Sequence, residues 1–81
     1  MKVVWDEPKR LANIDKHGID FVQMDSFDWI AARVIPARSG RLQAIGTLDD
    51  KVVTVIFRAL GTEAISIISV RTANAEERRL L

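Results

Sequence analysis

The run of β-branched residues from Val52 to Leu60 constrains the fold of this chain more than any other stretch. Valine, isoleucine and threonine favour strands because their side chains pack well on a pleated surface. Alternation predicts a strand with two faces, one made by Val53, Val55 and Phe57 and the other by Val52, Thr54, Ile56 and Arg58. The chain on either side of this strand also shows strand patterns.

Two pairs of turn residues, Asp49-Asp50 and Gly61-Thr62, predict tight turns at the two ends of this strand. Before the first turn, Arg41 to Thr47 alternates with a period of two and has one wetter face. After the second turn, Ala64 to Val70 is apolar on both faces, which predicts a strand inside the sheet with something covering each side. These segments together predict an antiparallel meander.

The N-terminal part of the chain predicts a short strand at Val3 to Trp5 and a helix from Glu7 to His17. Asp6 suits the N-cap of this helix, and Gly18 suits the left-handed residue that ends it. A polar stripe runs along one side of the helix and is made by Lys9, Asn13, Lys16 and His17. Because Leu11 and Ile14 point the other way, we expect the apolar side to dock on the sheet and the cationic side to stay available.

The remaining segments complete the predicted order. A second, shorter helix is predicted from Asp20 to Trp29, since apolar residues recur there at helix-like spacing, namely Phe21, Met24, Phe27 and Ile30. Val34 and Ile35 form a brief strand, and Asn74 with Glu77 gives the capping box of a final helix. The order β-α-α-β-β-β-β-α predicts one domain over residues 1–81 of the α+β class, an antiparallel sheet with helices mainly on one face.

Composition limits the possible chemistry. The chain has no cysteine and one histidine, which excludes disulfides, thiolate zinc sites and a multi-histidine metal site within one chain. An all-carboxylate magnesium site stays open on these counts. The net charge is only +1, so any phosphate-binding surface must come from local clustering of cations. With no export signal or membrane-spanning run, we expect a cytoplasmic protein.

Three stretches resemble the BrnT family, the toxin halves of a type II toxin–antitoxin system. Trp5 to Phe21 matches the family's opening motif as W-D-x-x-K-x-x-x-N-x-x-K-H-G-I-x-F. Arg41 to Gly46, R-L-Q-A-I-G, is similar to an R-x-x-x-I-G strand, and Ile67 to Arg79 is similar to an I-I-S-A-R-x-A-x-x-x-E-R segment. The family pattern also has an aromatic residue, often Tyr, a few positions after E-R, where this chain has Leu80 and Leu81.

The resemblance implies an endoribonuclease that stops translation, with a fold related to RelE-type toxins and with no cofactor or metal. It also implies a cognate BrnA-like antitoxin with a ribbon-helix-helix DNA-binding part. Toxin and antitoxin are then expected to form a hetero-oligomer that represses their own promoter, with operator DNA contacted only through the antitoxin.

Metal-free cleavage of RNA needs a base, an acid and fixed cations, because the 2′-hydroxyl must lose a proton and attack the neighbouring phosphorus. The candidate catalytic residues are His17, Arg41, Arg58, Arg71 and Glu77. His17 has the only side chain with an unperturbed pKa near neutrality, and guanidinium groups pair with phosphate in a bidentate way. The candidate RNA-binding residues are Lys9, Lys16 and Arg78.

Each of these residues also has a structural interpretation. His17 suits a helix C-terminus, Glu77 is explained by its capping box, and the arginines suit ion pairs on the wet face of the sheet. The lysines suit a solvated face or an acidic antitoxin segment, and Asn13 suits either a strand edge or substrate. A non-catalytic corepressor module that only binds a partner is therefore the alternative function. A small-molecule enzyme is disfavoured because the chain has no Gly-rich phosphate loop.

Overall fold

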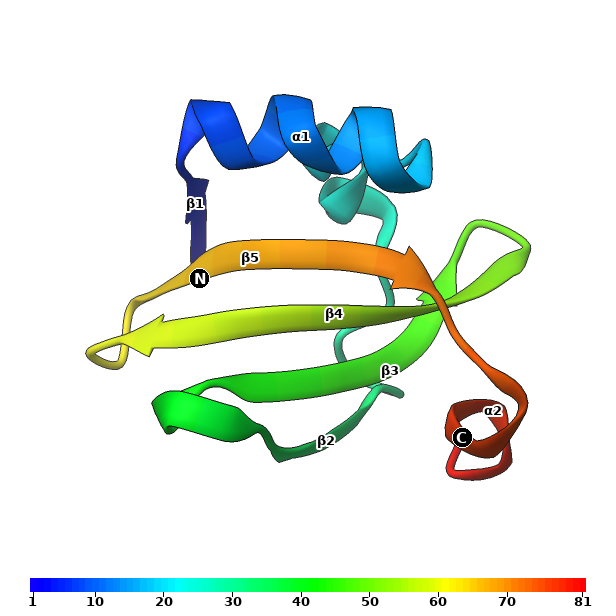
Figure 1. The fold of residues 1–81 in the computed structure, drawn as a ribbon. Helices are drawn as coiled ribbons and strands as arrows, with labels where there is room; N and C mark the ends of the chain where they lie inside the picture. Colours follow the sequence, from blue (N-terminus) through cyan, green and yellow to red (C-terminus); the bar gives the residue numbers. More distant parts are fainter.

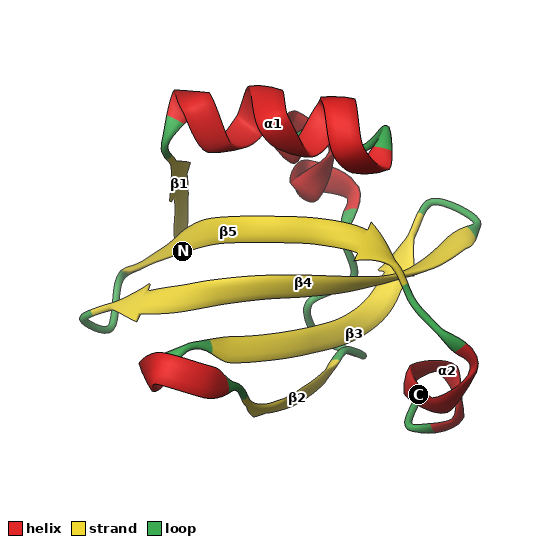
Figure 2. Ribbon diagram, viewed as in Figure 1, coloured by secondary structure: helices red, strands yellow, loops and turns green.

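A computed structural model describes all residues, 1–81, and contains one five-stranded sheet in the order β1-β5-β4-β3-β2 (Figure 1). The strands are β1 (Lys2–Trp5), β2 (Arg33–Pro36), β3 (Leu42–Leu48), β4 (Lys51–Leu60) and β5 (Ala64–Thr72). The helical segments are α1 (Glu7–His17), the 3-10 helices η1 (Phe21–Ser26) and η2 (Arg38–Gly40), and α2 (Ala75–Arg79) (Figure 2). The α+β class predicted from the sequence is confirmed. Neither α1 nor α2 has the length and hydrophobicity that a membrane-spanning helix needs.

The sheet is not the purely antiparallel meander that the sequence predicts. Strands β2 to β5 are antiparallel neighbours, but β1 pairs in parallel with β5, from Lys2 opposite Ala64 to Trp5 opposite Ile67. A parallel pair needs a long crossover, and here residues 6–63 lie between the two partners. The alternation of apolar and polar residues in a strand shows which side chains share a face, but it does not show which strand is the neighbour. The pairing of β1 with β5 could therefore not be predicted from the sequence.

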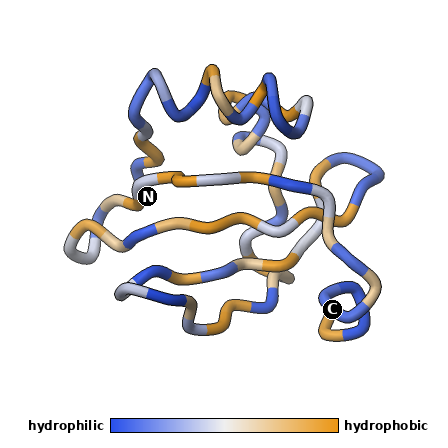
Figure 3. Tube along the Cα trace, in the orientation of Figure 1, coloured by the Kyte–Doolittle hydropathy of each residue, from blue (hydrophilic) through white to orange (hydrophobic).

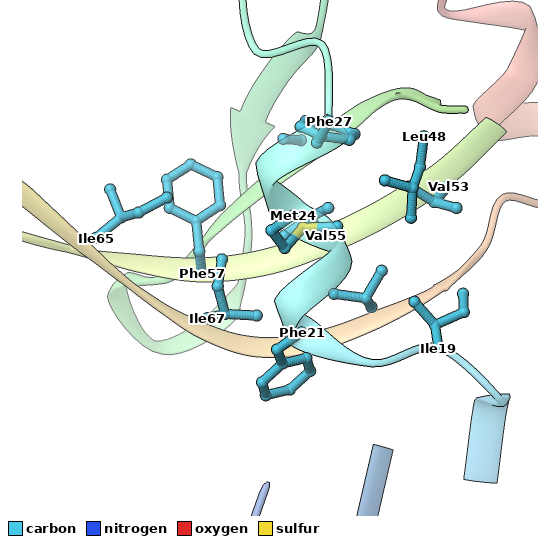
Figure 4. Close-up of a cluster of buried hydrophobic side chains, with 12 residues drawn as sticks. Ile19, Phe21, Met24, Phe27, Leu48, Val53, Val55, Phe57, Ile65 and Ile67 are labelled. Atoms are coloured by element: carbon cyan, nitrogen blue, oxygen red, sulfur yellow. The ribbon is translucent and has the colours of Figure 1, made fainter. Parts of the chain in front are cut away.

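The core lies on one face of the sheet, where η1 covers the central strands (Figure 4). Its buried cluster consists of Ile19, Phe21, Met24, Phe27, Ala44, Leu48, Val53, Val55, Phe57, Ile65, Ile67 and Val70. The predicted faces of β4 are confirmed, since Val53 and Val55 are fully buried there. Figure 3 shows the resulting contrast between a largely hydrophobic β4 and the more hydrophilic positions of α1.

The predicted second α-helix is instead the 3-10 helix η1, so the predicted order is wrong at that element and also lacks η2. The apolar spacing explains the difference. Phe21, Met24 and Phe27 recur every three residues, which matches the three residues per turn of a 3-10 helix, and all three are buried. Ile30, the fourth member of the expected series, is fully exposed.

Helix α1 is rotated from the predicted orientation because, of the two apolar residues expected to face the sheet, Ile14 is half-buried and Leu11 is exposed. It lies alongside β5 and runs in the same direction (Figure 1), with Asn13 buried against the strand and Leu11 56% exposed. Asn13 Nδ2 donates to Val70 O at 3.0 Å and to Ile19 O at 2.8 Å, and Val70 N donates to Asn13 Oδ1 at 3.0 Å. These bonds continue the sheet edge where β1 has ended, so a polar side chain and not an apolar stripe sets the rotation of the helix.

The prediction that the helices lie mainly on one face of the sheet is wrong, because η1 and α2 lie on opposite faces. The α2 residue Glu77 contacts Gln43 and Arg71, whose side chains alternate with the core residues Ala44 and Val70. Hence α2 covers one end of the face opposite the core, where Ile45 and Thr54 are fully buried. The rest of this second face, towards the other end of β4 and β5, is open and is called the open face below.

Candidate active site

Arg71 and Glu77 form a bidentate ion pair at the α2 end of the open face. Arg71 Nη1 lies 2.7 Å from Glu77 Oε1, and Arg71 Nη2 lies 2.8 Å from Glu77 Oε2. The final turn of β5 into α2 makes this possible, because the Asn74 side chain caps α2 and the Glu77 side chain accepts a bond from Asn74 N at 2.9 Å. The predicted capping box is confirmed, and the same carboxylate also orients an arginine.

The Glu77 carboxylate is held by four hydrogen-bond donors. Besides Arg71 and Asn74, it accepts a 2.7 Å bond from Gln43 Nε2, which reaches across β4 from β3. The Arg71 guanidinium, with the Asn74 N–H, lowers the pKa of Glu77 to about 2, and the pKa of Arg71 is raised in return. The buried Thr54 hydroxyl contributes to this lowering, although its geometry falls short of a full hydrogen bond. At neutral pH this carboxylate is ionised and saturated, which suits a positioning group and not a proton acceptor.

Arg41 and Arg58 lie elsewhere on the open face, in a groove of about 330 Å³ that we call the arginine groove. It is lined by Lys9, Arg41, Arg58, Leu60, Ser66 and Ile68. The turn at η2 places Arg41 at the start of β3, since Ala37 N bonds to Arg41 O at 2.9 Å and Arg41 N to Arg38 O at 3.1 Å. Arg58 Nη2 points to Ser39 O at 3.4 Å, which directs its guanidinium towards η2.

His17 lies in a second groove, of about 180 Å³, between α1 and β5, which we call the histidine groove. Its lining includes Lys9, Lys16 and His17 from α1 and Ile68 and Ser69 from β5. The last turn of α1 presents His17 here because Asn13, one turn earlier, fixes the helix against Val70. The predicted polar stripe is therefore a wall of this groove, and of its members Asn13 has a structural role at the strand edge.

The two grooves are neighbours, since Lys9 and Ile68 line both. Neither is lined by a carboxylate, so five basic side chains face them without an acidic one: Lys9, Lys16, His17, Arg41 and Arg58. Because the net charge of the whole chain is only +1, phosphate binding needs a local cluster of cations, and these grooves provide one. A surface of this kind can hold more than one phosphate of a nucleic-acid strand.

The structure thus groups the candidate residues into three places. Arg71 and Glu77 form one pair, Arg41 and Arg58 share the arginine groove, and His17 lines the histidine groove. Arg78 is exposed on α2 and lines neither groove. No three side chains of the kinds that bind metals are gathered anywhere in the chain.

Sequence reasoning missed Gln43 as part of the site. Its alternation with Arg41 places both side chains on the same face of β3, which is a signal of shared location. Its bond to Glu77 depends on where α2 returns to the sheet, and no local pattern contains that information. The residue therefore enters the site only through the tertiary fold.

The chain is similar to known proteins in both sequence and structure. A family model described as the ribonuclease toxin BrnT of type II toxin–antitoxin systems matches residues 5–77, which include every candidate residue except Arg78. The chain is also similar to a solved structure, the 1.1 Å crystal structure of the Brucella abortus ribonuclease toxin BrnT. That similarity has a TM-score of 0.80 and 45% sequence identity, and it covers 91% of this chain and 97% of that one. No curated protein matches this sequence.

Proposed function

This chain belongs to the BrnT family of ribonuclease toxins of type II toxin–antitoxin systems, and from this we propose that it is a metal-independent endoribonuclease that inhibits translation. The observation that carries the proposal is the pair of adjoining grooves lined by five basic side chains and no carboxylate. A surface that concentrates positive charge on a nearly neutral protein suits a polyanionic substrate.

The cleaved phosphate is placed between His17 and Arg71 in this proposal. Ser69 lines the histidine groove and lies two residues before Arg71 on the same face of β5, a separation of about 7 Å along a strand. His17 then exchanges the proton of the attacking 2′-hydroxyl or of the leaving 5′-oxygen. Arg71 stabilises the charge that develops on the phosphate oxygens, using N–H groups that do not bond to Glu77. Glu77 acts by positioning Arg71.

The remaining basic residues serve binding. Lys9, Lys16 and Arg78 contact the RNA backbone, and Arg41 and Arg58 hold the strand in the arginine groove. The relation of the fold to RelE-type toxins belongs to the same proposal.

As a type II toxin, the protein has a protein antitoxin as its partner. We propose that this antitoxin carries a ribbon-helix-helix part and that the complex represses its own promoter in the cytoplasm. This part of the proposal rests on the family and not on the geometry. Co-purification of toxin and antitoxin followed by a promoter-DNA mobility shift tests it, and a complex that leaves operator DNA unshifted contradicts it.

The cleavage reaction is tested with purified protein, end-labelled RNA and a metal chelator. We expect cleavage with chelator present, products ending in a 2′,3′-cyclic phosphate, and no cleavage where the 2′-hydroxyl is replaced by hydrogen. His17→Ala and Arg71→Ala are each expected to lower the rate by about 100-fold or more. Lys51→Ala is a matched control, because Lys51 is an exposed cation that lines neither groove.

The same variants separate the enzyme from a corepressor module in cells. Expression without antitoxin is expected to arrest growth and degrade RNA for the parent and for Lys51→Ala, but not for Arg71→Ala. Unaffected growth with intact RNA for the parent favours the non-catalytic partner-binding module.

A further inference from the structure

The three cations of the arginine groove, Lys9, Arg41 and Arg58, have no carboxylate within ion-pair distance. The arginines that do have one are Arg10, paired with Glu7 and Asp20, and Arg71, paired with Glu77. Because like charges repel, three such cations around one groove cost stability unless an anion binds there. We propose that the arginine groove binds a phosphate of single-stranded RNA distinct from the cleaved one, which builds on the ribonuclease function proposed above.

The distance to Arg71 requires a separate phosphate. Arg71 lies opposite Thr54 in the sheet, and Arg58 is four residues further along β4 on the same face. Four residues of strand span about 13 Å. The Arg58 guanidinium also points away from Arg71, towards Ser39 O. One phosphate group is too small to contact both arginines, so a strand that touches both presents at least two different phosphates.

The open face favours contacts to the backbone of the strand over contacts to its bases. Proteins that read or hold unpaired bases usually stack them on aromatic rings. The chain has two Trp and three Phe, and all five belong to the core cluster or pack against it. The groove offers only aliphatic walls, at Leu60 and Ile68. Binding in this groove is therefore expected to depend on phosphate charge and to tolerate changes of base sequence.

Binding of an uncleavable strand tests this inference directly. The probe is a fluorescent single-stranded 2′-O-methyl RNA of about eight nucleotides, within the range bound by small single-strand folds. Its affinity is measured by fluorescence anisotropy over a series of salt concentrations for the parent, Lys9→Gln/Arg58→Gln and the control Lys51→Gln. Lys9, Arg58 and Lys51 are all exposed, so none of these changes opens the core.

We expect the groove variant to bind about tenfold more weakly than the parent and to lose about 1.4 from the slope of log affinity against log salt, about 0.7 per cation. The Lys51→Gln control should match the parent. Groove-variant binding with the affinity and slope of the parent would overturn the inference. The affinity of an acidic peptide, polyglutamate, is measured in the same way. If the groove variant binds polyglutamate more weakly than the parent but binds RNA equally well, the inference is overturned, because the groove then serves a protein partner.

The position of the bound phosphate is tested with neutral methylphosphonate linkages placed one at a time along the strand. One position is expected to weaken binding to the parent but not to the Arg58→Gln variant, and it should lie two or more linkages from the cleaved bond. Coincidence with the cleaved bond would overturn the inference. Cleavage of unmodified RNA by the parent is followed in parallel, because binding without cleavage refutes the proposed function and leaves the groove assignment standing.

Discussion

Gln43 Nε2 lies 2.7 Å from Glu77 Oε2, so the carboxylate that orients Arg71 is itself held from β3, across the intervening strand β4. Glu77 thereby ties the C-terminal helix to two strands of the sheet. In the function proposed above, Glu77 therefore supports Arg71, and His17 is the residue that transfers the proton. Several measurable consequences depend on that division.

Replacing Glu77 by Gln is expected to lower kcat for RNA cleavage by about 10 to 100-fold, because Arg71 loses the partner that fixes its guanidinium. The shape of the pH–rate profile should not change, since a carboxylate with a pKa of about 2 is not the base at neutral pH. Single-turnover kinetics over a pH series measure both quantities. Loss of one limb of the profile in the variant would show that Glu77 titrates during catalysis.

Replacing Gln43 by Ala removes one donor from the Glu77 carboxylate and should lower kcat by about tenfold while KM stays nearly constant. The free energy of unfolding should fall by about 1 to 2 kcal/mol, the usual size for a hydrogen bond to a charged group. Thr47→Ala is a matched control, because Thr47 is exposed on the same face of β3. An effect on KM alone would place Gln43 in substrate contact and not in support.

The Arg71–Glu77 pair predicts a pH dependence of stability with a definite sign. Because folding lowers the pKa of Glu77 from 4.5 to about 2, the stabilisation is fully present above pH 4.5 and is lost as the pH falls towards 2. Its size is about 1 to 2 kcal/mol after allowance for solvent screening of the partly exposed Arg71. Urea unfolding of the parent and of Glu77→Gln should therefore converge at acid pH. A difference that stays constant down to pH 2 would contradict this account.

Replacing Asn13 by Leu should destabilise the fold by about 2 to 4 kcal/mol, because Val70 N and Val70 O lose their partners at a buried strand edge. Asp15→Ala, an exposed change on the same helix, should stay within about 0.5 kcal/mol of the parent. Urea unfolding measures both. Near-parental stability of the Leu variant would mean that α1 does not depend on this edge contact.

Replacing Gly46 by Ala should cost about 1 to 3 kcal/mol, because the added Cβ would lie 2.8 Å from Phe27 Cζ. The glycine of the R-x-x-x-I-G stretch therefore serves packing. The double variant Gly46→Ala/Phe27→Leu should be more stable than the sum of the two single effects predicts. Simple additivity, measured by denaturation of all four proteins, would show that the two side chains do not clash.

The local elements were largely predictable from particular residues. Asp6 and Gly18 cap α1 as expected, with Gly18 in the left-handed conformation at φ 70°, and Asn74 caps α2. The two faces of β4 follow from its alternation, and the resemblance to the toxin family follows from motifs in the linear sequence. These features depend on residues within a few positions of one another, so the sequence by itself determined them.

The tertiary structure decided the long-range relationships. The parallel pairing of β1 with β5, the rotation of α1 through Asn13 and the reach of Gln43 to Glu77 each join residues far apart in the chain. The same holds for the separation of Arg41 and Arg58 from Arg71, which the sequence presents only as three strand arginines. Side-chain periodicity specifies which way a residue points, whereas its neighbours depend on how the strands and helices pack, and that packing minimises the free energy of the whole domain.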